Sequence, residues 1–146
     1  MYQNPKYLKR INRLEANGDV QLFDLKNDII INAEKIFYLK DEEKIFTLGK
    51  TLIQVSDRYD IEGHDLIFLK NKMLLSSKKN AVITDNESNI YSLEQFQYSI
   101  DKEILKGENI TMTTSNKENK SDKFFFQTGF FNLKENKFLA KDVTST

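Results

Sequence analysis

The sequence predicts an all-β fold assembled from a tandem repeat of about 30 residues. Ile, Phe, Tyr and Thr are abundant whereas Ala occurs four times, a balance that favours strands over helices. Apolar residues recur mostly at offsets of two, the side-chain period of a strand. Five aromatic residues also recur at an almost constant interval along the chain.

The five aromatic residues anchor the repeat unit. They lie 31, 30, 30 and 33 residues apart, at Tyr7, Tyr38, Phe68, Tyr98 and Phe131. Seven residues after each anchor stands an apolar residue: Leu14, Ile45, Leu75, Leu105 and Phe138. Nine residues after it stands a small residue: Ala16, Thr47, Ser77, Gly107 and Ala140. Eleven residues after it stands a turn-tolerant or polar residue: Gly18, Gly49, Lys79, Asn109 and Asp142. This ungapped agreement argues against chance periodicity.

Each unit is expected to hold two antiparallel strands of about ten residues. The polar connectors at 40–44 and 101–103 predict hairpin turns, and the polar stretches at 86–89 and 115–122 predict loops. An offset of three, as between Ala33 and Ile36, breaks the strand period once and predicts a β-bulge or bend. A helical repeat would instead require a stripe with offsets of three and four, which residues 28–33 lack.

Strand pairs of equal length with one apolar face have two ways to bury that face. They either close into a barrel or fold into two facing sheets. Both arrangements place a continuous apolar interior along the stack and leave an unpaired edge strand at each end. No Pro-rich or helical segment caps either end, and the first unit begins in mid-pattern at Tyr7. We therefore expect part of a longer stack, or a module that joins others edge to edge.

Composition and charge exclude several classes of function. The formal net charge is zero, so no basic field indicates nucleic-acid binding. The chain contains no Cys, which excludes disulfides, Cys-ligated zinc and thiol catalysis. Its single His, His64, excludes a multi-His metal site within one chain and is most simply an exposed or hydrogen-bonded residue. No two carboxylates are spaced as a general acid and base, so we expect neither an enzyme nor a cofactor.

The sequence shows neither a predicted transmembrane helix nor a recognisable signal peptide. It has no apolar run of 18 or more residues, so no transmembrane helix is predicted. Residues 1–10 lack the apolar region of a signal peptide. Either the chain stays in the cytoplasm or its natural N-terminus is missing.

Two consecutive units resemble a known family. The pattern Leu14-x-Ala16-x-Gly18-x-Val20, followed by INAEKIFY at 31–38, is similar to the OstA-like domains of lipopolysaccharide-transport proteins. The segment 45–55, followed by IEGHDLIF at 61–68, repeats this pattern. The resemblance covers residues 7–142. Within that family (LptA, LptC and LptD), the sequence most resembles the N-terminal periplasmic domain of the LPS-assembly proteins of the LptD type.

The resemblance implies a non-catalytic lipid conduit with a β-jellyroll (taco-like) fold. Its apolar groove would shield the acyl chains of lipopolysaccharide or a similar lipid. Its open edges would join other jellyroll domains by β-augmentation, in the periplasm or at the periplasmic side of the outer membrane. Residues 1–146 would form one such domain or a fragment of one. A longer chain of the LptD type would add an outer-membrane barrel, and the missing Cys would remove the tether to it.

The inward positions of the repeat are the candidate lipid-binding residues. They are Ile31, Ile36, Tyr38, Ile45, Ile53, Ile61, Leu66, Phe68, Leu75, Tyr91, Phe96, Tyr98, Leu105, Phe124, Phe126 and Phe131. Each is equally explained as an ordinary core residue. The small residues either widen a groove or allow tight sheet packing: Ala16, Ala33, Thr47, Gly63, Ser77 and Gly107. The turn lysines are either solvated charges or partners of lipid phosphates: Lys40, Lys44, Lys70, Lys72, Lys78 and Lys79.

Two other classes of protein remain open at this stage. The first is a structural or adhesive β-repeat with a dry core, either a stalk or a glycan-binding right-handed parallel β-solenoid. The second is an enzyme on a β-sandwich, which is disfavoured because polar groups do not converge. An open interior without buried charge favours the conduit, whereas a dry and closed core favours the stalk. Parallel strand pairing would exclude the jellyroll.

Overall fold

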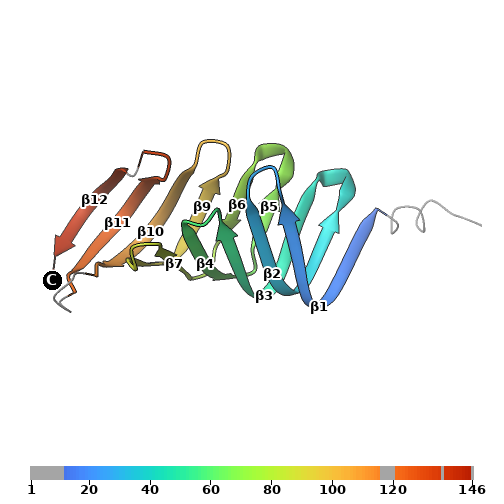
Figure 1. Ribbon diagram of the computed structural model, residues 1–146, viewed down its shortest axis with the longest axis horizontal. Helices are drawn as coiled ribbons and strands as arrows, with labels where there is room; N and C mark the ends of the chain where they lie inside the picture. The colour runs from blue at the N-terminus through green and yellow to red at the C-terminus, as the bar shows by residue number, and fades with distance from the viewer. Residues whose placement is uncertain (1–11, 116–120, 136, 146) are drawn as a thin grey trace, which may run out of the picture.

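The computed structural model describes residues 12–115, 121–135 and 137–145, and this part of the chain is all-β, as the sequence predicts. The anchor Tyr7 lies outside the described residues. Figure 1 shows the strands stacked side by side along the longest axis, from β1 at one end to β12 at the other. Within the described residues the strands are β1 (Arg13–Asp24), β2 (Ile29–Leu39), β3 (Lys44–Val55), β4 (Tyr59–His64), β5 (Ile67–Leu69), β6 (Leu74–Ser77), β7 (Ala81–Asp85), β8 (Ile90–Leu93), β9 (Gln95–Ser99), β10 (Ile104–Thr113), β11 (Lys123–Asn132) and β12 (Lys137–Ser145), with short 3₁₀ turns η1 (Lys40–Glu42) and η2 (Lys70–Lys72).

Eight of these strands close an antiparallel β-barrel. Its order is β3, β4, β7, β8, β10, β9, β6, β5 and back to β3. The barrel closes because β3 and β10 each serve two neighbours: β3 pairs β5 near its start and β4 near its end. β10 pairs β9 near its start and β8 near its end. We call layer A the sheet formed by β4, β7 and β8 together with the halves of the long strands that continue it, and layer B the sheet formed by β5, β6 and β9 together with the other halves of those strands. Strands β1 and β2 extend the sheet beyond β3, and β11 and β12 extend it beyond β10.

Every strand pairing in the described residues is antiparallel. The parallel β-solenoid is therefore wrong for this part of the chain. The expected hairpin turns at 40–44 and 101–103 are confirmed, the first as the 3₁₀ turn η1.

The expected ten-residue strands occur at the two ends of the stack but not in its middle. There the chain divides into β4 and β5, β6 and β7, and β8 and β9. The break lies where the chain turns from one layer into the other, and Asp65 takes a left-handed φ of 51° at one such corner. In β2 the same position is an irregularity in the pairing between Ala33 and Lys35, so the expected bulge is confirmed there. Gly49 and Asn109 also have positive φ, 82° and 49°, because β3 and β10 bend there without breaking.

The anchors and the residues seven positions after them lie opposite one another in one row across layer B. The strand register joins, pair by pair, Tyr38, Ile45, Phe68, Leu75, Tyr98, Leu105, Phe131 and Phe138. A second row crosses layer A through Leu22, Ile31, Ile53, Ile61, Ile83, Tyr91, Met112 and Phe124. Both rows contribute to one core cluster.

Neighbouring turns of layer B are joined by a recurring backbone hydrogen bond. Its N–H donors are Lys40, Lys70, Ile100 and Leu133, which donate to the carbonyl oxygens of Asn12, Glu43, Met73 and Glu103 respectively. The donor–acceptor distances are 2.9, 2.9, 2.8 and 2.9 Å. The row of turns is therefore held together independently of the strand ladder, which fixes the spacing of the hairpins along the stack.

Candidate functional site

The interior between layers A and B is the candidate site, because it collects the residues that the repeat singles out. All sixteen candidate lining residues lie in it: fourteen are buried, and Tyr38 and Phe124 are half-buried and pack against the core. Burial of side chains of this size contributes roughly 1.5–3 kcal/mol each to folding. Their placement in one core does not by itself distinguish lipid contact from ordinary packing, so the lipid role stays a prediction.

The interior of the described residues contains little polar surface. Its buried polar side chains are Thr47, Thr51 and Ser77, and no charged side chain of the described residues is buried. Of the small residues at these positions, Ala33, Gly63, Ser77 and Gly107 are buried, whereas Ala16 on β1 is exposed. An added Cβ at Gly107 would lie 2.1 Å from Leu93 Cδ2, so this glycine allows tight packing and does not widen a groove.

Within the barrel the two layers pack without room for a lipid chain. A cavity of about 10 Å³ remains, lined by Val55, Tyr59, Ile61, Ile83, Tyr98, Leu105 and Leu133. Such a volume is about that of one water molecule. An acyl chain would therefore enter this part only if the layers separated.

The apolar interior becomes accessible at both ends of the stack. On the β1 side, Leu14 is 58% exposed and Leu22 is half-buried. On the β12 side, Phe124 and Phe138 are half-buried, and they join a group of stacked and edge-on rings with Phe126 and Phe131. Among the described residues β1 pairs with β2 alone and β12 with β11 alone, so each is an edge strand.

A cleft of about 430 Å³ separates the two layers toward the β12 end. Its walls are the turn 85–89, which follows β7 in layer A, and the turn 132–134 after β11. At its floor Tyr91 meets Phe131 edge-on, with ring centroids 4.8 Å apart. Burial raises the pKa of Tyr91 above its ordinary value, and the Asp85 carboxylate that accepts its hydroxyl hydrogen bond adds to this rise.

Arg58 closes the inner end of this cleft. It lies in the turn between β3 and β4, with its guanidinium 5.5 Å from the centre of the Tyr59 ring. It donates a hydrogen bond to the carbonyl oxygen of Leu133, in the turn that follows β11. This bond joins a turn of layer A to a turn on the layer B side. Nothing in the sequence marks Arg58, because the residue that it contacts is 75 positions away.

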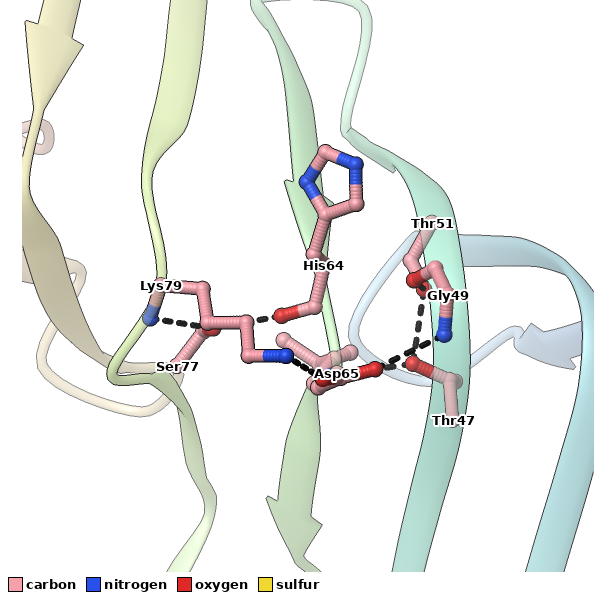
Figure 2. A network of polar contacts seen from close by, with 8 residues as sticks. Thr47, Gly49, Thr51, His64, Asp65, Ser77 and Lys79 are labelled. Carbon is pink, nitrogen blue, oxygen red and sulfur yellow. Dashed lines mark hydrogen bonds and ion pairs between the residues drawn. The ribbon is translucent and has the colours of Figure 1, made fainter.

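A polar network ties the corners together on the side away from this cleft (Figure 2). Thr47 and Thr51 hydroxyls lie 2.6 Å apart, and Thr47 accepts a hydrogen bond from the backbone N–H of Leu66 at 2.9 Å. Asp65 accepts from the backbone N–H of Gly49 at 2.7 Å and pairs with Lys79. Hydrogen bonds from Lys79 and Gly49 hold the pKa of Asp65 below its ordinary value.

The same network joins the corner of β4 to that of β6. The Ser77 hydroxyl donates to the carbonyl oxygen of His64 at 2.6 Å. The His64 side chain is exposed, and Figure 2 shows its imidazole pointing away from the network. No group of three potential metal ligands occurs among the described residues. The network therefore positions the corners.

The turn lysines lie at the surface. Lys40, Lys70, Lys72, Lys78 and Lys79 are exposed, and Lys44 is half-buried. The ammonium of Lys70 lies 5.5 Å from the Tyr38 ring centre, and that of Lys44 lies 5.8 Å from the Phe46 ring centre. Contact with lipid phosphate stays a prediction for all six.

Comparison of the sequence with protein-family models and with curated proteins finds no match. Across the part of the chain that the structure describes, no helix has the length and apolar character needed to cross a membrane.

Proposed function

We propose that this chain is a non-catalytic module that shields lipid acyl chains between its two layers and joins further β-domains through its edge strands. The finer fold that we propose is the β-jellyroll of lipopolysaccharide-transport proteins, with β3 and β10 as its bent strands and the aromatic repeat as its building unit. The proposed location is the periplasm.

One observation carries the proposal. The inward rows are apolar from one edge strand to the other and become accessible at both ends, where Leu22 and Phe124 are half-buried. An ordinary globular core has no reason to continue to two open ends. An acyl chain gains about 0.8 kcal/mol for each CH₂ that it buries. Along a uniform apolar row, a moving acyl chain would exchange each contact for a similar one.

Site-specific photo-crosslinking tests this function in a lipopolysaccharide-producing cell. A photoreactive phenylalanine analogue replaces Phe124 or Phe68, which face the interior. The matched control is Phe125, the neighbour of Phe124, which is 40% exposed. We expect lipid adducts from Phe124 and Phe68 but not from Phe125. If no interior position yields a lipid adduct, the conduit is rejected.

The packed interior of the barrel favours a second candidate, a structural β-repeat with a dry core. The cavity of about 10 Å³ is the specific observation behind it. Such a stalk would still assemble edge to edge, but amphiphiles would not stabilise it. A lipid that binds only the folded protein raises the unfolding temperature increasingly as its concentration exceeds its Kd, whereas a dry stalk shows no shift.

A further inference from the structure

The cleft between the turns 85–89 and 132–134 combines an aromatic floor with cations at its margin. Tyr91, Phe131 and Phe138 form the apolar part, Arg58 closes the inner end, and Lys134 also lines the cleft. Phe138 also packs against Phe126 of the core, with ring centroids 4.6 Å apart. The floor of the cleft is thus continuous with the apolar interior.

The cleft also contains two acidic side chains, one held within its turn and one exposed. Asp85 is engaged within its own turn, where it accepts from the backbone N–H groups of Glu87 and Asn89 at 2.9 Å each. It also accepts from the Asn89 amide at 3.0 Å and from the Tyr91 hydroxyl at 3.1 Å. Glu87 is exposed on the layer A wall. Lys137 also lines the cleft, but its ammonium lies 3.5 Å from the Glu135 carboxylate, so the proposal relies on Arg58 and Lys134.

The Arg58 hydrogen bond lies between this cleft and the closed core. Its acceptor Leu133 is buried and fixed, because the Leu133 N–H donates to the carbonyl oxygen of Glu103 at 2.9 Å. Leu133 and Tyr59 also line the small cavity beneath. Separation of the layers at this point must therefore break the Arg58 hydrogen bond before the interior becomes continuous with the cleft.

We propose that this cleft binds an amphiphile with an anionic head group, and that Arg58 is a latch that the head group releases. The anionic head group then accepts the hydrogen bond that the Arg58 guanidinium now donates to the carbonyl oxygen of Leu133, because a charged acceptor forms a stronger hydrogen bond than a neutral carbonyl. The apolar tail then lies against Phe131 and Phe138, in line with the interior. This proposal rests on the proposed function and specifies where a lipid enters and what opens the way.

The test measures the separation of the two turns and the binding of defined probes in the same protein. The chain has no Cys, so Asn86→Cys on the layer A wall and Glu135→Cys just after the turn 132–134 accept spin labels without side reactions. Because the second label removes the ion-pair partner of Lys137, every comparison is made within the doubly labelled protein. The probes are dodecyl phosphate, dodecyl maltoside with its uncharged head, and inorganic phosphate, all below micellar concentrations. Pulsed EPR gives the distance distribution, and calorimetry gives the affinity.

Arg58→Met removes the donors and keeps the aliphatic stem. Its matched control is Arg13→Met, because Arg13 also stacks on an aromatic ring, Phe37 at 4.9 Å, away from the cleft. Arg58→Lys keeps the charge and supplies a second variant if Arg58→Met does not fold.

We expect dodecyl phosphate to lengthen the distance between the labels and inorganic phosphate to leave it unchanged. In Arg58→Met the longer distance appears without ligand, and the preference for dodecyl phosphate over dodecyl maltoside falls about tenfold, as loss of a charge-assisted hydrogen bond predicts. In Arg58→Lys the label distance and the preference for dodecyl phosphate should lie between those of wild type and Arg58→Met. In Arg13→Met both should match wild type.

Three results overturn the latch. If both dodecyl probes bind but the label distance and the head-group preference do not depend on Arg58, the latch fails while the conduit survives. If inorganic phosphate alone separates the turns, the site takes a free anion and not an amphiphile. If neither dodecyl probe binds anywhere, the latch and the proposed function fail together.

Discussion

The buried hydroxyl of Thr47 should contribute more to stability than its neighbour Thr51. Thr47 is 1% exposed, and it accepts the backbone N–H of Leu66 at the break between β4 and β5. The Thr51 hydroxyl donates to the carbonyl oxygen of Gly49 at 3.2 Å, so the proton between the two hydroxyls belongs to Thr47. The hydrogen bonds therefore form a series: the Leu66 N–H donates to the Thr47 hydroxyl, which donates to the Thr51 hydroxyl, which donates to the carbonyl oxygen of Gly49.

The change Thr47→Val keeps the shape of the side chain and leaves the Leu66 N–H buried without an acceptor. An orphaned buried donor costs about 1–3 kcal/mol, so we expect a loss near 2 kcal/mol. Thr51→Val removes the hydrogen bonds of its hydroxyl to Thr47 and to Gly49 but leaves the Leu66 N–H satisfied, and about 1 kcal/mol is expected. The double variant then loses less than the sum of the two, because the shared hydroxyl contact disappears only once.

Urea denaturation of the four proteins, followed by circular dichroism, measures these free energies of unfolding. The slopes should agree, so that differences in midpoint report stability alone. The reasoning is refuted if Thr47→Val is neutral within about 0.5 kcal/mol or costs less than Thr51→Val, because the orphaned donor would then carry no penalty.

Three further outcomes are expected. Phe68→Ala should lower the free energy of unfolding by about 3–5 kcal/mol, whereas Phe125→Ala, at an exposed position, should cost far less; equal losses in denaturation would contradict the assigned core. Asp65 has a lowered pKa, so its contribution to stability is present above the carboxyl pKa of the unfolded chain and is lost as the pH falls through the lower folded value; Asp65→Asn should flatten this part of the stability–pH curve. Burial raises the pKa of Tyr98 to about 12, so the fold should lose stability as the pH rises from about 10 toward that value, and absorbance titration should show Tyr98 ionising late; ionisation near pH 10 in the folded protein would contradict this.

Side-chain periodicity predicts the strands of this protein because it depends on near neighbours. Offsets of two place residues such as Ile29, Ile31 and Ala33 on one face, and all three are buried. The three-residue offset after Ala33 also marks the corner, since a strand that leaves one layer must shift its inward face. Candidate lining residues were predictable for the same reason.

Features that depend on contacts between distant residues were not predictable. Arg58 looks like any turn cation until the fold brings Leu133 beside it. Leu133 and Ile83 are both buried, but neither is among the predicted lining residues. The sequence also does not distinguish the corners at Asp65 and Glu94, where the strands break, from those of β3 and β10, which bend without breaking.

The sequence by itself determined that the chain is all-β, where its turns lie and which residues face inward, because these depend on a local period and on turn chemistry. Only the tertiary structure decided that eight strands close a barrel, that its centre is packed and that a cleft opens near β12. The physical reason is that closure and packing depend on how two layers meet. The periodicity of one strand contains no information about the distance to the layer opposite.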